Sequence, residues 1–182
     1  MNIVITGASG FIGRRLLRNL AKDGHSLHVL SRHAGTNLPG GVRLSVWDAM
    51  KGPPPADALR DAGATELCTV LSDIPMVTAR DIDEVFAALK PGRGAVLVPS
   101  RDFTGTNIIA RSPAGVIPTL FGRMSLVKHL DECRRANVPC EIIRQTGPAL
   151  DLDLLADLIE FVRSAGPSNT LNQLARLGIA SN

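Results

Sequence analysis

The sequence predicts an α/β fold, a single three-layer α/β/α domain over residues 1–182 with a mostly parallel sheet. Two observations support this prediction. Strand-like apolar runs alternate with amphipathic helix-like runs to the end of the chain, which is typical of parallel sheets covered by helices on both faces. The chain has 182 residues, 45% hydrophobic and 20% charged, an ordinary balance for one globular domain with a sizeable core.

Hydrophobic periodicity sets the expected elements. Short apolar runs predict strands over residues 2–6, 27–31, 42–46, 67–72, 95–99, 107–110 and 140–144. Apolar residues at helical spacing predict helices over residues 11–22, 56–62, 79–89, 125–136, 151–164 and 170–177. Thr78 and Ser125 precede or begin two of these helices and are expected to cap them. Residues 52–55, Gly-Pro-Pro-Pro, predict a stiff loop.

A glycine-rich turn joins the first strand to the first helix. The glycines of Thr-Gly-Ala-Ser-Gly-Phe-Ile-Gly, residues 6–13, permit a tight turn, close approach of a pyrophosphate, and close packing of helix and strand. Backbone N–H groups at a helix N-terminus attract anions. Residues 1–62 therefore read as a Rossmann-like, dinucleotide-binding half, with the cofactor contacts Gly7, Ser9, Gly10, Phe11, Ile12 and Gly13. A tight turn without a ligand is the alternative, because the spacing is G-x-x-G-x-x-G rather than G-x-G-x-x-G.

The end of the second strand bears on the choice of cofactor. An NAD site typically has Asp or Glu there to hold the ribose hydroxyls, whereas this chain has Ser31-Arg32-His33. A guanidinium can pair with a 2′-phosphate, so Arg32 favours NADP over NAD. A solvated arginine at a strand end is the alternative interpretation.

The second half carries carboxylates and hydroxyls at strand and helix ends. Asp73 follows the strand predicted over 67–72, and Asp151 and Asp153 open a predicted helix. A hard cation such as Mg²⁺ prefers one or two carboxylates together with phosphate oxygens. Taken alone, Asp73 is better explained as a turn or capping residue, and helix capping with the helix dipole explains Asp151 without a metal. Residues 102–107 and 121–125 likewise offer either an anion pocket or ordinary turn chemistry.

Residues 1–62 resemble the N-terminal part of extended short-chain dehydrogenase/epimerase proteins. The matching text is MNIVITGASGFIGRRLL, then HVLSR, then VRLSVWDAMKGPPPADAL. The resemblance implies NAD(P) binding. It also implies a catalytic tyrosine with a lysine four residues later, and the chain contains no tyrosine. An NADP-binding protein without epimerase chemistry is therefore one functional hypothesis.

Residues from about 63 to 182 resemble the C-terminal part of guanylyltransferases that act on 2-phospholactate, phosphoenolpyruvate or related phosphoacids and make the precursor of the deazaflavin redox coenzyme. The resemblance rests on LSDIPMVTARDI, TGTN, FGRMSLVKHL and ALDLDLLADL, in this order, and on the tail SNTLNQLARLGIA. It implies Mg²⁺-dependent transfer of GMP from GTP. By this resemblance Asp73 and Asp153, with Asp151 as the less favoured ligand, would hold the ion and act catalytically. The substrate would contact Thr104, Gly105, Thr106, Asn107, Gly122 and Ser125.

The chain therefore reads as a junction, near Gly63, between a dinucleotide-binding-like half and a nucleotidyltransferase-like half. In the resembling guanylyltransferases the N-terminal half carries a lysine- and arginine-bearing loop that grips the triphosphate, and the dehydrogenase-like segment occupies that place here. We expect a guanylyltransferase first and an NADP-binding protein second. A chimeric fold without catalytic function is the third hypothesis.

The composition of the chain limits the classes of binding partner that we expect. The net charge is +3, and no basic run with interleaved aromatic residues occurs, so nucleic acid is not expected as a partner. The three cysteines show no C-x-x-C spacing, which argues against a zinc site or a disulfide framework. No apolar stretch reaches membrane-spanning length. We expect a cytoplasmic protein that binds small molecules, with no membrane partner, as a possible homodimer.

Overall fold

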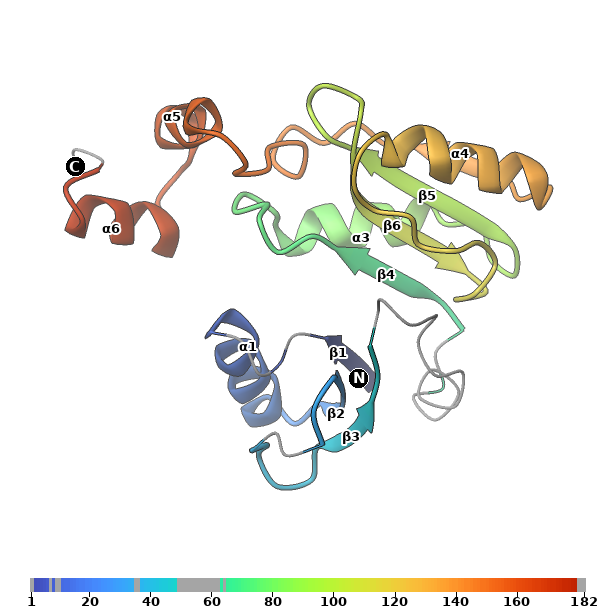
Figure 1. Ribbon diagram of the computed structural model, residues 1–182, viewed down its shortest axis with the longest axis horizontal. Coiled ribbons are helices and arrows are strands. Elements are labelled where there is room, and N and C mark those ends of the chain that lie inside the picture. Colours follow the sequence, from blue (N-terminus) through green and yellow to red (C-terminus); the bar gives the residue numbers. More distant parts are fainter. Residues whose placement is uncertain are drawn as a thin grey trace. The chain divides into compact units, whose positions relative to one another are not determined.

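The computed structural model describes residues 2–179 apart from residues 7, 9, 10, 35, 36, 49–62 and 64. The chain divides into two compact units, Met1–Thr65 and Glu66–Asn182 (Figure 1). The boundary between them lies close to the junction expected near Gly63. The helix predicted over 56–62 and the loop predicted over 52–55 lie outside the described residues.

The first unit is a three-stranded parallel sheet with one helix. It contains β1 (Asn2–Thr6), α1 (Phe11–Lys22), β2 (Ser26–Ser31) and β3 (Arg43–Val46), with the strands in the order β1-β2-β3 (Figure 1). Leu17 of α1 packs on Ile5, Leu27 and Val29 of the sheet. This contact is the helical apolar stripe that the periodicity of residues 11–22 predicts.

The second unit is built on a four-stranded mixed sheet. Its elements are β4 (Leu67–Val70), α3 (Ala79–Ala88), β5 (Gly94–Pro99), β6 (Thr106–Ser112), α4 (Ser125–Arg135), β7 (Cys140–Ile142), α5 (Leu155–Ser164) and α6 (Asn169–Arg176). The strand order is β4-β6-β5-β7, in which β6 runs antiparallel to both neighbours and β5 runs parallel to β7.

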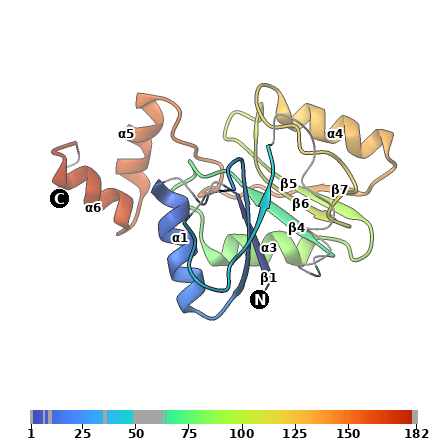
Figure 2. The same cartoon turned by 60° about the horizontal axis from the view of Figure 1, so that its bottom comes forward.

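Helices cover both faces of this sheet. On one face, Val85 and Leu89 from the α3 region pack on Val96 and Ile108. On the other, Leu126 and the rest of the apolar side of α4 pack on a second cluster that includes Leu97 and Ile109. Figure 2 shows α3 and α4 on opposite sides of the strands. Alternate residues of β5 and β6 therefore pack in two separate hydrophobic cores, one on each face of the sheet. This is expected for the central strands of a three-layer α/β/α arrangement.

The predicted α/β class is confirmed, and three of the five strand pairs in the described part of the chain are parallel. That both halves form one domain stays a prediction. Thr78 caps α3 as expected: its side chain accepts from the N–H of Asp81, and the Asp81 carboxylate accepts from the N–H of Thr78.

Two predictions about helix starts are wrong. Ser125 is the first residue of α4 rather than its cap, a place taken by Met124 in a left-handed conformation. The helix expected from residue 151 begins at Leu155, so Asp151 and Asp153 lie in the preceding segment, which is neither helix nor strand.

Within the described residues, none of the helices combines the length and the apolar character needed to cross a membrane.

Candidate functional site

The segment after β4 meets the segment before α5. The backbone N–H of Leu152 donates to the carbonyl oxygen of Asp73 over 3.0 Å. Close packing continues nearby, because a Cβ atom at Gly147 would lie 2.8 Å from the carbonyl oxygen of Met76. Glycine is therefore required at this contact between backbones. The structure thus brings together two of the motifs that the sequence places far apart.

Three carboxylates lie on the two segments that meet here, the one after β4 and the one before α5. Asp73 and Asp153 are exposed, whereas Asp151 is half-buried. Burial raises the pKa of the Asp151 carboxyl above its usual range, and the negative charges of Asp153, Asp73 and Asp157 raise it further. The negative charges of these aspartates therefore repel one another.

Nearby like charges are what a divalent cation relieves, and carboxylate oxygens are the ligands that Mg²⁺ prefers. Among the described residues, no group of three or more His, Cys, Asp or Glu side chains is placed so as to hold a metal ion. Two carboxylates suffice for Mg²⁺ when substrate phosphates and water complete its coordination. The assignment of Asp73, Asp153 and Asp151 as metal ligands stays a prediction.

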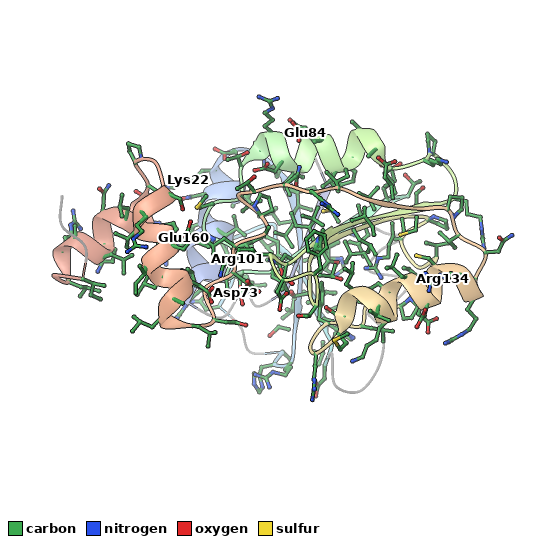
Figure 3. All side chains as sticks on the ribbon, turned by 90° about the horizontal axis from the view of Figure 1, so that it is seen from above. Lys22, Asp73, Glu84, Arg101, Arg134 and Glu160 are labelled. Atoms are coloured by element: carbon green, nitrogen blue, oxygen red, sulfur yellow. The ribbon has the colours of Figure 1, made fainter. Side chains whose placement is uncertain are left out.

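Asp157 and Arg101 brace this region and are not anticipated from the sequence. Asp157 accepts from the backbone N–H of Leu154 at 2.9 Å and from the Arg101 guanidinium at 3.0 Å. The backbone N–H of Arg101 donates in turn to the carbonyl oxygen of Ala149. Figure 3 labels Arg101 and Asp73 in this part of the molecule. The first-turn position of Asp157 could be found from the helix start, but its pairing with Arg101 depends on the tertiary fold.

A second cluster, the polar loop of residues 100–105, is organised by one aspartate. Asp102 accepts from the hydroxyls of Ser100 and Thr104, at 2.6 and 2.8 Å, and from the backbone N–H of Thr104 at 3.0 Å. These bonds, first the one from the Ser100 hydroxyl, lower the pKa of Asp102 to about 2. The carboxylate is thus used to shape the loop.

The polar loop is joined to the beginning of α4. The N–H of Leu126 donates to the carbonyl oxygen of Thr104 at 3.3 Å, and the N–H of Thr106 donates to Ser125 Oγ at 2.8 Å. The N–H of Ser125 donates to the carbonyl oxygen of Gly122, a glycine with φ of +96°. The structure therefore gathers the predicted substrate residues of the polar loop and of the start of α4 into one place.

Within this group the exposures differ. Thr104 and Gly122 are exposed, Gly105 is half-buried, and Thr106 and Ser125 are buried. At Gly105 a Cβ atom would lie 2.9 Å from Ser100 Oγ, so the loop closes only around a residue without a side chain. Their role in binding substrate stays a prediction.

Asn107 connects the two clusters. Its side-chain amide donates to the carbonyl oxygen of Pro148 at 3.0 Å, and its backbone carbonyl oxygen accepts from the N–H of Leu71. Leu71 is followed closely by Asp73. Pro148 is followed closely by the acidic segment, residues 151–153. Asn107 is 1% exposed, so in this structure it supports the site from beneath. A direct contact with substrate stays a prediction.

The predicted cofactor residues belong to the first unit. Gly7, Ser9 and Gly10 lie outside the described residues, as do the side chains of Phe11 and Ile12. Gly13 lies in α1 and is half-buried, and Arg32 is exposed directly after β2. The described residues place β1, α1 and the parallel neighbour β2 in the order that a dinucleotide-binding half needs.

Two families match the chain, one for each half. Residues 3–53 match the NAD dependent epimerase/dehydratase family. Residues 56–182 match the family described as Guanylyl transferase CofC like. The change from one match to the other falls between residues 53 and 56, on the N-terminal side of the boundary of the two structural units at Thr65.

Similar proteins are named guanylyltransferases. The phosphoenolpyruvate guanylyltransferase of Sphaerobacter thermophilus is 37% identical over 131 residues, covering 72% of this chain and 58% of the relative. A 3-phospho-D-glycerate guanylyltransferase of Phenylobacterium zucineum is 26% identical, covering 67% and 56%, respectively. The 2-phospho-L-lactate guanylyltransferase of Methanocaldococcus infernus is 32% identical, covering 63% and 52%. The chain thus spans little more than half the length of these relatives.

The fold has a counterpart among solved structures. A crystal structure from Desulfovibrio desulfuricans G20, described as a nucleotide-diphospho-sugar transferase, aligns with a TM-score of 0.61 and 19% identity over 91% of this chain and 79% of the other. This similarity confirms the predicted Rossmann-like α/β fold. Because the family match covers more than half of the sequence, the chain belongs to the family of CofC-like guanylyl transferases.

Proposed function

We propose that the second unit acts as a guanylyltransferase, which transfers GMP from GTP to a small phosphoacid and requires Mg²⁺. The observation that carries this proposal is the joining of Asp73 to the acidic segment through the bond from Leu152, with Asn107 tying the polar loop to the same place. Carboxylates for a cation and hydroxyls for an anion are thus built on one framework.

The chemistry of such a transfer asks little covalent work of the protein. A phosphate oxygen of the acceptor attacks the α-phosphorus of GTP and forms a P–O bond, and the bond from that phosphorus to the departing pyrophosphate breaks. A divalent ion supplies charge neutralisation on the reacting phosphates. Asp73 and Asp153 would hold this ion, since both carboxylates are exposed and both act on the pKa of Asp151.

The acceptor would lie at the start of α4. Thr104, Gly122 and Ser125 would orient its phosphate and carboxylate groups, which are the groups that phosphoenolpyruvate, 2-phospholactate and 3-phosphoglycerate share. Alignment of two anionic reactants accounts for a large part of the rate enhancement in such a reaction. GTP is proposed over other nucleotides because the relatives are named guanylyltransferases.

Product analysis tests this proposal. The chain is incubated with α-labelled GTP, Mg²⁺ and each of the three phosphoacids, and the reaction is examined for a diphosphate that links GMP to the phosphoacid and for stoichiometric pyrophosphate. We expect both products with at least one phosphoacid and neither in Asp73→Asn. The matched control is Asp83→Asn on the exposed side of α3, which should behave as the unmodified chain does. A folded chain that forms no such diphosphate with any of them contradicts the proposal.

A second candidate function is NADP binding by the first unit. It is favoured by the parallel β1–α1–β2 arrangement and by the family match over residues 3–53. Without a tyrosine the chain lacks the acid/base group that the epimerase resemblance implies, so we propose binding without epimerase chemistry. A titration that follows NADPH fluorescence tests it, and a signal unchanged by the protein contradicts it.

A further inference from the structure

A buried histidine lies beneath the start of α4. His129 has 0% of its surface exposed and is bonded at both ring nitrogens. The backbone N–H of Leu120 points at Nε2 over 2.7 Å, and Nδ1 lies 3.0 Å from the hydroxyl oxygen of Thr106. The imidazole therefore links the segment before Phe121, the helix α4 and the first residue of β6.

These two contacts fix the tautomer. A backbone N–H can only donate, so Nε2 must be the acceptor and carries no proton. A neutral imidazole then has its proton on Nδ1, and Nδ1–H donates to Thr106 Oγ1. An imidazolium would set the Nε2 proton against the N–H of Leu120, so the charged form does not fit.

The environment agrees with a neutral ring. Burial, followed by the positive charges of Arg111 and Lys128, lowers the pKa of His129 to about 4. Arg111 is itself buried under the segment before α4, where it donates to the carbonyl oxygen of Ile117 at 2.9 Å. The uncharged ring of Phe121 also contacts His129, in an edge-on arrangement with 5.7 Å between the two ring centroids.

The tautomer has a consequence for the Thr106 hydroxyl, and a backbone hydrogen bond has a similar one for the hydroxyl of Ser125. Thr106 Oγ1 accepts from His129, so its own proton must be donated elsewhere. Ser125 Oγ likewise accepts from the N–H of Thr106 at 2.8 Å. Within the described ranges neither hydroxyl proton has an acceptor, although the two residues are only 1% and 2% exposed. Because buried polar groups are hydrogen-bonded in most structures, these two hydroxyl protons are suited to donate to a bound acceptor.

We propose that His129 is a positioning residue: by donating to Thr106 Oγ1 it keeps the Thr106 hydroxyl as a hydrogen-bond donor, beside that of Ser125, for an oxyanion of the phosphoacid. The inference rests on the proposed guanylyltransferase function and assigns to its acceptor site a preference for a fully ionised phosphate or carboxylate group. Two donors beside a ring that offers no free acceptor favour a bare oxyanion over a hydroxyl, which brings a proton of its own.

The tautomer is tested without any substrate. Side-chain ¹⁵N correlation spectra distinguish Nδ1–H from Nε2–H, and the signals of His129 are identified by their loss in His129→Gln. We expect the Nδ1–H form at pH 7 and a neutral ring on titration down to pH 5. An Nε2–H tautomer, or protonation near the ordinary histidine pKa, overturns the inference.

The role in binding is tested with phosphoenolpyruvate as the probe. Thr106→Val keeps the shape but removes the hydroxyl, and loss of a hydrogen bond to a charged group should raise the KM for the phosphoacid about 10- to 100-fold. His129→Phe should raise the same KM and leave that for GTP unchanged. Thr106→Ser and His129→Gln, which retain donors and acceptors, should recover most of the loss.

The outcomes separate the two proposals. If the unmodified chain does not use phosphoenolpyruvate, 2-phospholactate or 3-phosphoglycerate, the proposed function fails, and the ligand named in this inference fails with it. If the unmodified chain is active and Thr106→Val leaves the KM for the phosphoacid unchanged, the role of His129 fails while the function stands. Because Thr106→Val is isosteric, this result does not depend on whether His129→Phe folds.

Discussion

The backbone N–H of Leu152 donates to the carbonyl oxygen of Asp73 at 3.0 Å, and this bond joins the segment after β4 to the segment before α5. The bond involves main-chain atoms only, so it leaves both neighbouring carboxylates, those of Asp73 and Asp153, free to act on another group. The effect of both charges on the pKa of Asp151 indicates that the three side chains share one electrostatic environment.

Asp151→Asn should stabilise the protein at neutral pH in the presence of a chelator. A carboxyl whose pKa is raised in the folded state binds its proton more tightly there, so its contribution to stability falls as pH rises through the raised value. The amide carries no charge and escapes this loss. We expect a higher Tm than the unmodified chain at pH 7 and a vanishing difference below about pH 4, near the unfolded value. An equal shift at both pH values contradicts the electrostatic account.

Asp102→Asn should show the opposite dependence on pH. The lowered pKa means that the carboxylate contributes stability above its unfolded value, and this contribution is lost as pH falls through about 2. The side chain is exposed, so solvent screening keeps the effect small. Urea unfolding should give a lower free energy for the variant at pH 7 and a smaller difference near pH 2.5. Asp83→Asn, on α3, is the control and should show neither effect.

Gly105→Ala should destabilise the second unit through a steric clash. The added Cβ would lie 2.9 Å from Ser100 Oγ, closer than such atoms normally come, and 3.3 Å from Ser100 Cβ, which is also a tight contact. Overpacking of this kind costs about 1–3 kcal/mol of unfolding free energy. The matched control is Gly115→Ala, where nothing lies within 4 Å of the added atom. Equal unfolding free energies for the two variants would refute the close approach of Gly105 to Ser100.

Arg32→Ala should reduce the stabilisation of the protein by NADPH more than that by NADH. A guanidinium at the end of β2 can pair with the 2′-phosphate that only NADPH carries. We expect NADPH to raise the Tm of the unmodified chain and the variant to lose most of this increase. Arg15→Ala, an exposed arginine of α1, serves as the control. A Tm increase of the same size for both cofactors would argue against recognition of the 2′-phosphate.

The local pattern of the sequence predicts most of the elements. β1 and α1 have the bounds that the periodicity of residues 2–6 and 11–22 gives, since apolar spacing reports directly on which face is buried. The antiparallel course of β6 is set by a different feature. Only residues 100–105 separate β5 from β6, and a parallel crossover needs a dozen or more residues. Alternation of strands and helices does not report this connection length.

The site is predicted less completely, because its polar groups are used by partners distant in sequence. Ser125 looks like a helix cap, yet its oxygen accepts from the N–H of Thr106 on β6. His129 has no spacing to another metal ligand, and its tautomer follows only from contacts with Leu120 and Thr106. Residue type identifies such groups as candidates, and the tertiary fold decides which of their atoms remain available.

Binding of Mn²⁺ as a substitute for Mg²⁺, measured by electron paramagnetic resonance in the presence of GTP, tests the central claim most directly. The account predicts one Mn²⁺ site in the unmodified chain and in Asp83→Asn. In Asp73→Asn and in Asp153→Asn the affinity should fall about 10- to 100-fold while the thermal transition is retained, because each of these exposed carboxylates contributes a charged ligand. Equal Mn²⁺ affinity in all four proteins would contradict it, since the ion would then be held elsewhere.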